Sequence, residues 1–339
     1  MLIVFIGGSG VGGCLVHPAA PLSISTFAVK PVKAIALPVQ TPAPATPSAG
    51  TGVPPMKDAS PQAPATPSGG TGVPPVIDNN PRRRDDAPAS PAYGAGVPQS
   101  AQLLSLQHAI ALRYAGCQPV VWGSRLTGIQ THLGGEGKCL ALTFDACGYG
   151  KKSQGYDAAL IAALRREQVP ATLFISGLWA DAHPDLVKLL AADPLFEIEN
   201  HGLRHLPCSV NGHGAYHLPG TRNAEDVVLE VEGNAEKLQT LTGRKPHYFR
   251  AGTAMYDDVA LAIIADLGDT VAGFSVLGDA GATYSAAQVQ TALLSARPGD
   301  MVICHMNHPE GETCAGVSAA IPLLKAKGFR FVRLDDSDQ

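Results

Sequence analysis

The sequence is poor in charged residues and has no basic surplus. Only 16% of its 339 residues are Asp, Glu, Lys or Arg, and the formal net charge is −4. Soluble proteins average about 25% charged residues. Without a basic surplus the chain cannot neutralise many phosphates, so we exclude nucleic acid as a partner. The sequence also lacks a C-x-x-C motif, which leaves a zinc ribbon and a thioredoxin-type site without support.

Residues 1–100 lack the composition of a folded domain. They hold 18 of the 28 prolines, three aromatic residues and no Glu. Residues 43–55 (APATPSAGTGVPP) recur at 63–75 (APATPSGGTGVPP) with one mismatch. Such a repeat has almost nothing to bury, and a Pro-rich chain forms a semi-extended spacer. We therefore predict a disordered, Pro-rich linker over residues 23–99, which is either a tether or a low-complexity expansion without a role.

The N-terminus lacks what a dinucleotide-binding fingerprint needs. G-x-G-x-x-G occurs at residues 8–13, but two prolines follow closely and no acidic residue precedes Asp58. The fingerprint requires a helix directly after it and an acidic residue about 20 positions on. We interpret residues 1–22 as an export signal instead, because the apolar run is shorter than the ~20 residues of a membrane span and ends in small residues.

A lipid anchor is a further expectation for this segment. The stretch Val11-Gly12-Gly13-Cys14 resembles a bacterial lipoprotein box, in which the cysteine is lipidated after cleavage. The resemblance implies a lipid anchor at Cys14 to a bacterial membrane, and an exported, periplasmic or envelope-associated protein. No Lys or Arg precedes the apolar run, so a wrongly assigned start is the alternative.

From residue 139 onward, short apolar runs alternate with segments of helical periodicity. Predicted strands are Leu140–Asp145, Ala171–Ser176, Phe196–Glu199, His247–Arg250, Val271–Val276, Met301–Cys304 and Phe329–Leu334. Predicted helices are Asp157–Glu167, Pro184–Ala192, Ala224–Leu241, Asp257–Leu267, Ala286–Ala296 and Gly316–Lys327. This alternation favours a parallel α/β sheet. Seven strands indicate a barrel or an incomplete one over residues 139–339, with an open sheet as the alternative. We expect a helical lead-in over residues 100–138.

Polar residues follow the ends of several predicted strands. They are Asp145, His201 with His205, Arg250, Asp279 and His305. In parallel α/β folds the chemistry collects at the carboxyl ends of the strands. We therefore expect these side chains to share one site.

The residue types at these positions permit metal-assisted hydrolysis. His201 and His205 form H-x-x-x-H, and two neutral imidazoles make a partial zinc site that needs one or two further ligands. Asp145 complements them as third ligand or as general base. His305 could protonate a leaving group, and Arg250 could hold a carboxylate ionised. Ordinary structural roles, as polar core residues, caps or ion pairs, are the alternative for each.

The motifs together resemble the polysaccharide deacetylase (NodB-homology) family over about residues 139–334. The motifs are Thr143-Phe144-Asp145, His201-x-x-x-His205, Phe249-Arg250 and the apolar strand that ends in His305. The resemblance implies a distorted, incomplete (β/α)7 barrel. It also implies an enzyme that removes acetyl groups from an acetylated polysaccharide with a bound divalent metal, usually Zn²⁺.

The resemblance also implies a role for each matched residue. Asp145 matches the catalytic base, His201 and His205 match the metal-ligating histidines, Arg250 matches the arginine that orients the base, and His305 matches the catalytic acid. Asp279 matches the aspartate that tunes this histidine, although Gly278-Asp279-Ala280 fits the family motif poorly.

Two departures from the family pattern indicate a divergent member. Ala146 stands where the family usually has a second, metal-binding aspartate. Asp145 itself, Asp257, Asp258 or waters take its place, or metal affinity is low. The proline that usually follows two positions after the arginine is also absent, because the chain reads Arg250-Ala251-Gly252-Thr253.

The cysteines carry a separate prediction. If Cys14 is lipidated, six of the seven remain, which allows three disulfides in an oxidising envelope. Cys147 and Cys208 would then brace the site, and Cys304 and Cys314 would close the loop after the sixth strand. Reduced thiols in a cytoplasmic protein are the alternative.

The leading hypothesis is an exported, metal-dependent hydrolase that removes N- or O-linked acetyl groups from an envelope or extracellular polysaccharide. A small-molecule amidase on the same barrel is one alternative. A non-catalytic carbohydrate-binding protein is another, which Ala146 favours and which the retained Asp145, Arg250 and His305 oppose. Tyr256 and Trp179 either stack on sugar rings or pack in the core.

Overall fold

The computed structural model describes residues 99–135 and 137–338. The predicted export signal (residues 1–22), including Cys14, and all but the last residue of the predicted linker (23–99) lie outside the described residues. Within the described part, no helix is both long and apolar enough to cross a membrane.

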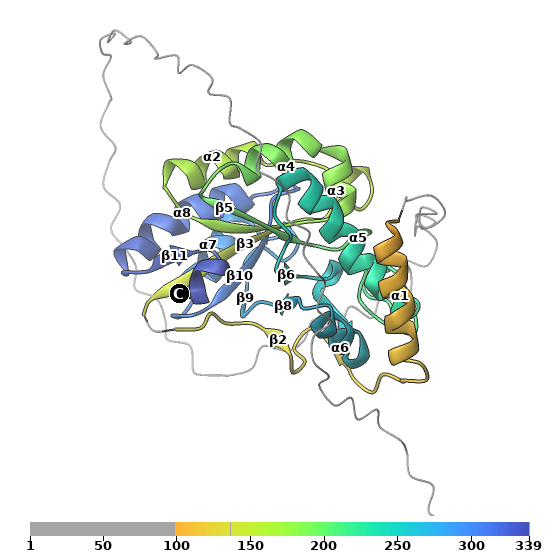
Figure 1. Cartoon of the computed structure of the whole chain (residues 1–339). Helices are drawn as coiled ribbons and strands as arrows, with labels where there is room; N and C mark the ends of the chain where they lie inside the picture. The colour runs from red at the N-terminus through yellow and green to blue at the C-terminus, as the bar shows by residue number, and fades with distance from the viewer. Residues whose placement is uncertain (1–98, 136, 339) are drawn as a thin grey trace, which may run out of the picture. The chain divides into compact units, whose positions relative to one another are not determined.

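A curled parallel sheet forms the centre of the folded part (Figure 1). Its strands are β2 (Ile129–Gln130), β3 (Cys139–Ala146), β4 (Ala171–Ile175), β5 (Phe196–Asn200), β6 (Tyr248–Phe249), β8 (Thr270–Ala272), β9 (Val276–Leu277), β10 (Met301–His305) and β11 (Arg330–Val332). They follow the order β2-β8-β6-β5-β4-β3-β10-β9, and β11 pairs with the start of β3. The pairs are parallel. The sheet confirms the predicted distorted, incomplete barrel, which is open between β2 and β9. A separate antiparallel pair joins β1 (Trp122–Gly123) and β7 (Tyr256–Asp257).

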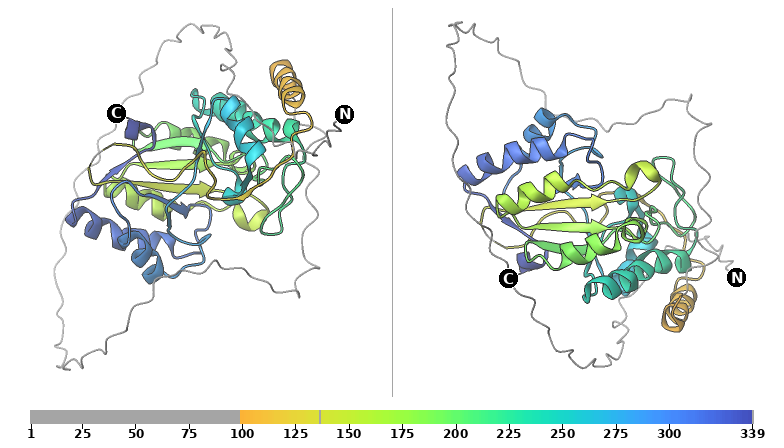
Figure 2. Two further views of the ribbon diagram at one scale, coloured as in Figure 1. Left: turned by 90° about the horizontal axis from the view of Figure 1, so that it is seen from below. Right: turned by 90° about the horizontal axis from the view of Figure 1, so that it is seen from above.

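Helices run alongside the strands in both views of Figure 2. They are α1 (Ala101–Arg113), α2 (Ala158–Arg166), α3 (Gly177–Ala182), α4 (Pro184–Ala191), α5 (Ala224–Thr242), α6 (Asp258–Asp266), α7 (Ala286–Leu294) and α8 (Thr313–Ala326). Short 3₁₀ turns lie at Lys151–Ser153, Gly252–Ala254 and Asp335–Asp338. All six predicted helices overlap observed ones. Ser285 begins α7 with a full capping box, which satisfies free backbone amides of the first turn. Gly243 ends α5 at φ 79°, a left-handed conformation that glycine adopts without strain.

The helix of the lead-in, α1, lies beside α5 at one side of the domain (Figure 1). Ser100 caps it by accepting from the Leu103 amide at 3.0 Å. At its other end, Arg113 and the Tyr114 hydroxyl both donate to Asp266. The lead-in also supplies strand β2, so the sheet begins before residue 139.

Side-chain alternation along the strands separates two cores. Phe196 and Ile198 of β5 face the apolar layer under the helices. Successive side chains of a strand point to opposite faces, so Glu197 and Glu199 point into the barrel. The second core consists of the buried apolar residues that fill this interior: Leu133, Ala141, Phe174, Tyr248, Ala272, Met301, Val332 and Leu334.

The prediction of one strand over Val271–Val276 is wrong. The segment contributes β8, which pairs with β6 and β2, and β9, which pairs with β10 at the opposite end of the strand order. Between them Gly273 passes close to β2, and a Cβ there would lie 2.6 Å from Ile129 Cγ2. An apolar run in the sequence does not reveal that the chain crosses the opening of the barrel.

Candidate active site

The predicted site residues meet at the carboxyl ends of neighbouring strands. Asp145 of β3 and His305 of β10 are register partners. The Arg250 amide, just after β6, donates to the Asn200 carbonyl at the end of β5 at 2.8 Å. His201 follows Asn200 directly. Parallel pairing therefore brings residues that lie up to 160 positions apart in the sequence to one edge of the sheet.

Asp145 and Arg250 form a buried ion pair. Arg250 Nη1 donates to Asp145 Oδ1 at 2.6 Å and to Thr143 Oγ1 at 3.0 Å. The other guanidinium nitrogens donate to the carbonyls of Ala272 and Gly273. Burial by itself raises the pKa of Asp145, but the charge of Arg250, together with nearby histidines, outweighs burial and lowers this pKa below its ordinary value. The pair keeps Asp145 ionised in the interior.

His305 and Asp279 form a second pair. Asp279 is fully buried. Its Oδ1 lies 2.9 Å from His305 Nδ1, and its Oδ2 accepts from the His305 amide and from Thr313 Oγ1. Burial lowers the pKa of His305, but the hydrogen bond and the charge of Asp279 outweigh this effect and place the pKa well above its ordinary value. A carboxylate can only accept, so Nδ1 carries a proton and Nε2 is the nitrogen left for the site.

His201 and His205 lie next to each other, but not on a helix. Their ring centroids are 4.7 Å apart and the rings are nearly perpendicular. The segment is a non-helical turn, in which Gly202 has φ 79° and His205 has φ 59°. A Cβ at Gly252 would collide with the His205 backbone. The turn is therefore held against the loop after β6 by a glycine that no other residue could replace.

Cys147 is a site residue that the sequence reasoning did not assign to the metal. Its Sγ lies 3.8 Å from His201 Nε2. One donor atom each of Cys147, His201 and His205 lies within 4.8 Å of the others, and all three residues are buried. Asp145 does not belong to this group, although its Oδ2 lies 3.5 Å from His201 Nε2. We call these three residues the thiol–imidazole cluster.

Comparison with known proteins identifies the family. The sequence profile described as polysaccharide deacetylase matches residues 133–272. Residues 133–272 therefore carry the sequence pattern of the polysaccharide deacetylase family. Asp279 and His305 lie beyond the matched residues, and their place in the site comes from the fold.

The individual proteins that the chain resembles are distant in sequence. The chitooligosaccharide deacetylase of Sinorhizobium fredii is 28% identical over 182 residues, which cover 50% of this chain and 80% of that protein. The structure of PdaA from Bacillus subtilis, a family 4 carbohydrate esterase, superposes with a TM-score of 0.51 at 21% identity, over 70% of this chain and 89% of that one. A mutant of a family 4 pseudoenzyme from Bacillus anthracis gives a TM-score of 0.52 at 17% identity, over 69% and 83% of the two chains. These structures share the fold.

The other groups considered as substitutes for the missing family aspartate have separate partners. Asp257 accepts from the amides of Ala260 and Val210, and Asp258 accepts from the amide of Val120. Neither belongs to the thiol–imidazole cluster. The cysteine two positions after Asp145 is the signal for this donor in the sequence, although the cysteine pattern predicts a disulfide for it.

The disulfide prediction is wrong for this polysaccharide deacetylase relative. Free thiols are present at Cys139, Cys147, Cys208, Cys304 and Cys314. Three disulfides among six cysteines are therefore excluded. Cys208 is a buried free thiol, and its carbonyl accepts from the Asp257 amide at 3.0 Å.

The aromatic residues considered for sugar stacking are core residues. Trp179 and Tyr256 are both fully buried. Trp179 Nε1 donates to the Gly155 carbonyl, and the Tyr256 hydroxyl accepts from the Ala251 amide. Each therefore braces a loop of the site from behind rather than facing a ligand.

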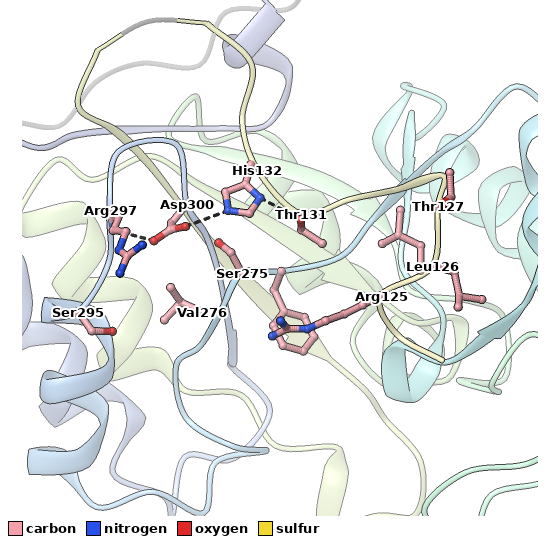
Figure 3. Close-up of a pocket in the computed structure, with 12 residues that line it drawn as sticks. Arg125, Leu126, Thr127, Thr131, His132, Ser275, Val276, Ser295, Arg297 and Asp300 are labelled. Carbon is pink, nitrogen blue, oxygen red and sulfur yellow. Dashed lines mark hydrogen bonds and ion pairs between the residues drawn. The ribbon is translucent and has the colours of Figure 1, made fainter. Parts of the chain in front are cut away.

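A cavity of about 600 Å³ lies at the opening of the barrel rather than at the site (Figure 3). Its lining residues include Arg125, Ile129, Thr131, His132, Ser275, Val276, Arg297 and Asp300. Figure 3 shows His132 between Thr131 and Asp300, so the segment after β2 contacts the residue that precedes β10. None of the candidate catalytic residues lines this cavity.

Proposed function

We propose that the protein is a metal-dependent hydrolase that removes acetyl groups from an acetylated polysaccharide. The supporting observation is the arrangement of a buried Asp145–Arg250 pair, a His305–Asp279 pair and two facing imidazoles at one sheet edge. A binding protein has no need for an ionised base and a protonated acid beside the same ligand. The relatives that act on chitooligosaccharides and peptidoglycan favour an amide-linked acetyl group on a sugar polymer.

The residues present fit a divalent metal. His201 Nδ1 lies 2.8 Å from the Arg250 carbonyl, which can only accept, so Nε2 keeps its lone pair. His205 Nδ1 is buried and has no hydrogen-bond partner among the described residues. We expect both imidazoles to hold the cation. When bound, it would polarise the acetyl carbonyl and lower the pKa of a water molecule.

The two pairs divide the proton transfers between them. Asp145, ionised by Arg250, accepts the proton of the attacking water through Oδ2, because Oδ1 is occupied by the guanidinium. His305, kept protonated by Asp279, donates from Nε2 to the departing amine or alkoxide. Arg250 and Asp279 are fully buried, and they act by positioning and charging their partners.

An exported location is part of this proposal, because a polysaccharide of the envelope is reached from outside the cytoplasm. A lipid anchor at Cys14 and a Pro-rich tether would hold the hydrolase near such a polymer. Incorporation of radiolabelled palmitate into the full chain, and its loss in Cys14→Ser, would test the anchor. An unlabelled wild-type chain would contradict it.

The function is tested by acetate release from acetylated chitooligosaccharides and peptidoglycan by the full chain, with Zn²⁺ and with chelator. We expect chelator-sensitive release that falls by about 10²–10⁴-fold in Asp145→Asn. Asp185→Asn is the matched control, because the Asp185 side chain is 94% exposed. If no acetylated glycan is hydrolysed while the protein retains metal, the deacetylase proposal is wrong and a non-catalytic member of the family remains.

A further inference from the structure

The thiol–imidazole cluster has the dimensions of a tetrahedral metal site. Zn–S bonds of about 2.3 Å and Zn–N bonds of about 2.0–2.1 Å place sulfur and nitrogen roughly 3.6 Å apart in a tetrahedron. Cys147 Sγ and His201 Nε2 are 3.8 Å apart. The three donors span at most 4.8 Å, so shifts of about 1 Å would complete the geometry.

The backbone around the cysteine is built to hold it in place. Ser176 Oγ donates to the Cys147 carbonyl at 2.5 Å. The next residue, Gly148, has φ 73°, and a Cβ there would lie 2.5 Å from the Trp179 amide nitrogen. The chain therefore needs glycine after the cysteine to pass under α3. This fixes the direction in which the thiol leaves the strand end.

Two features of His205 are energetically unfavourable within the protein itself. His205 adopts a left-handed conformation, which costs about 1–3 kcal/mol for a residue other than glycine. Its buried Nδ1 lacks a partner among the described residues, and such a group costs a further ~1–3 kcal/mol. Strain and an unpaired polar atom persist where a ligand or a function compensates them.

We propose that Cys147 is the third protein ligand of the metal, and that a Cys-His-His set replaces the Asp-His-His set implied by the family. This inference rests on the proposed metal-dependent function. Thiolate and imidazole ligands favour Zn²⁺ and other thiophilic cations, whereas Mg²⁺ and Ca²⁺ require oxygen ligands. The donor set would therefore select a zinc-like ion, and three protein ligands would leave room on that ion for water or substrate. Ala146 then leaves the metal with a full set of protein ligands, because Cys147 supplies the third donor atom one residue later.

Another role for the thiol makes an opposite prediction. Cys147 also lies near His305, whose Nδ1 meets Asp279, and thiol, imidazole and carboxylate in a row form a nucleophilic triad in other enzymes. A nucleophile would remain active in chelator and would be lost with any replacement of sulfur. A ligand can be replaced by another donor.

The first experiment loads the metal-free full chain with Co²⁺ and records its absorption spectrum. We expect one equivalent to bind, with a thiolate-to-cobalt charge-transfer band in the near ultraviolet and strong visible bands of a tetrahedral ion. The band should persist in Cys314→Ser, a partly buried cysteine outside the cluster, and should vanish in Cys147→Asp while cobalt stays bound. A wild-type cobalt complex without the band, or a band retained in Cys147→Asp, would overturn the inference.

A second experiment uses the wild-type chain, so that a poorly folded variant cannot confuse the result. Iodoacetamide labelling is followed by peptide mass spectrometry with and without Zn²⁺. We expect bound Zn²⁺ to slow labelling of Cys147 at least about 10-fold and to leave Cys314 unchanged. Equal labelling of Cys147 with and without Zn²⁺ would show that sulfur is not a ligand.

The two proposals fail in different ways. Charge transfer without acetate release contradicts the deacetylase function and supports the ligand set. Chelator-resistant acetate release that is abolished by Cys147 alkylation contradicts the ligand set and establishes the nucleophile. Zn²⁺ affinity should fall at least about 100-fold in Cys147→Ala and recover in part in Cys147→Asp.

Discussion

Strand β5 connects two clusters of buried donors that use their lone pairs differently. The thiol–imidazole cluster lies beyond the carboxyl end of the strand. Glu197 and Glu199, on the inner face of the same strand, meet Asp335 in a second group whose oxygens also lie within 4.8 Å of one another. We call it the carboxylate cluster. By proximity alone, either could hold a cation.

The carboxylate cluster is saturated by the protein itself. Glu197 accepts from Thr172 Oγ1 and from the amides of Leu334 and Asp335. Glu199 accepts from Arg244 and from the two amides at the start of β6. These bonds attach the C-terminal segment and β6 to the barrel interior. Donor atoms can bind a cation only if they lie close together and their lone pairs are not already used by the protein. We therefore assign a structural role to the carboxylate cluster and metal binding to the thiol–imidazole cluster.

The arginines provide the strongest test of this comparison. Arg250→Met leaves Asp145 as an unpaired buried charge, so we expect stability to fall by about 3–5 kcal/mol and acetate release at neutral pH to fall at least about 100-fold. The Arg244 side chain is 43% exposed, and Arg244→Met should cost about 1–2 kcal/mol with unchanged kcat/KM. Denaturant unfolding and acetate assays measure both. Equal effects of the two variants on activity would contradict the division of roles.

Replacement of Asp279, which bonds to the catalytic acid His305, should give the next largest effect on activity. In Asp279→Asn the support for protonated His305 is removed, so the pKa of His305 falls. The protonated form is then lost at lower pH, and the alkaline limb of the activity profile should move to lower pH, with kcat at neutral pH reduced about 30-fold. A matched Asp335→Asn variant should leave the profile in place. A uniform loss without a shift of the limb would show that Asp279 is merely structural.

Glu199 of the carboxylate cluster and Asp145, which lies beside the thiol–imidazole cluster, should respond to pH in opposite directions. Burial, with the charge of Glu197 added, raises the pKa of Glu199 to about 8, whereas the pKa of Asp145 is lowered. The contribution of Glu199 to stability is complete below its ordinary value near 4.5 and is lost as pH rises through 8. Between pH 7 and 9 we expect a loss of about 1–1.5 kcal/mol, which Glu199→Gln should abolish. The contribution of Asp145 is lost only as pH falls below 3.8. Denaturant midpoints across pH measure this, and a wild-type profile that is flat from pH 7 to 9 would contradict it.

Two buried threonines give the smallest effects. Thr143 donates to the Val302 carbonyl and accepts from Arg250, and Thr172 donates to Glu197. Each Thr→Val change should cost about 1 kcal/mol of stability. Only Thr143→Val should lower acetate release, by about 3–10-fold, because only Thr143 holds the arginine that positions the base. A loss of activity in Thr172→Val would show that the clusters are coupled.

Much of the fold could be predicted from local pattern. Alternating apolar runs and helical periodicity located every strand that surrounds the site, because buried parallel strands and amphipathic helices leave strong signals. The two-residue strand β2 leaves no such signal, because two register pairs need no apolar run. The segment Val271–Val276 is largely apolar, so its pattern does not reveal that it is divided between β8 and the start of β9.

The candidate site was predictable as a set of residues and not as a geometry. The sequence alone determined that Asp145, His201, Arg250 and His305 end strands, because strand ends and chemistry coincide in parallel sheets. Only the tertiary structure decided that Arg250 reaches Asp145, that Asp279 faces His305, and that Cys147 points to the histidines rather than to Cys208. Those outcomes depend on strand register and on glycine-controlled turns, which set side-chain direction through contacts between residues far apart in the chain.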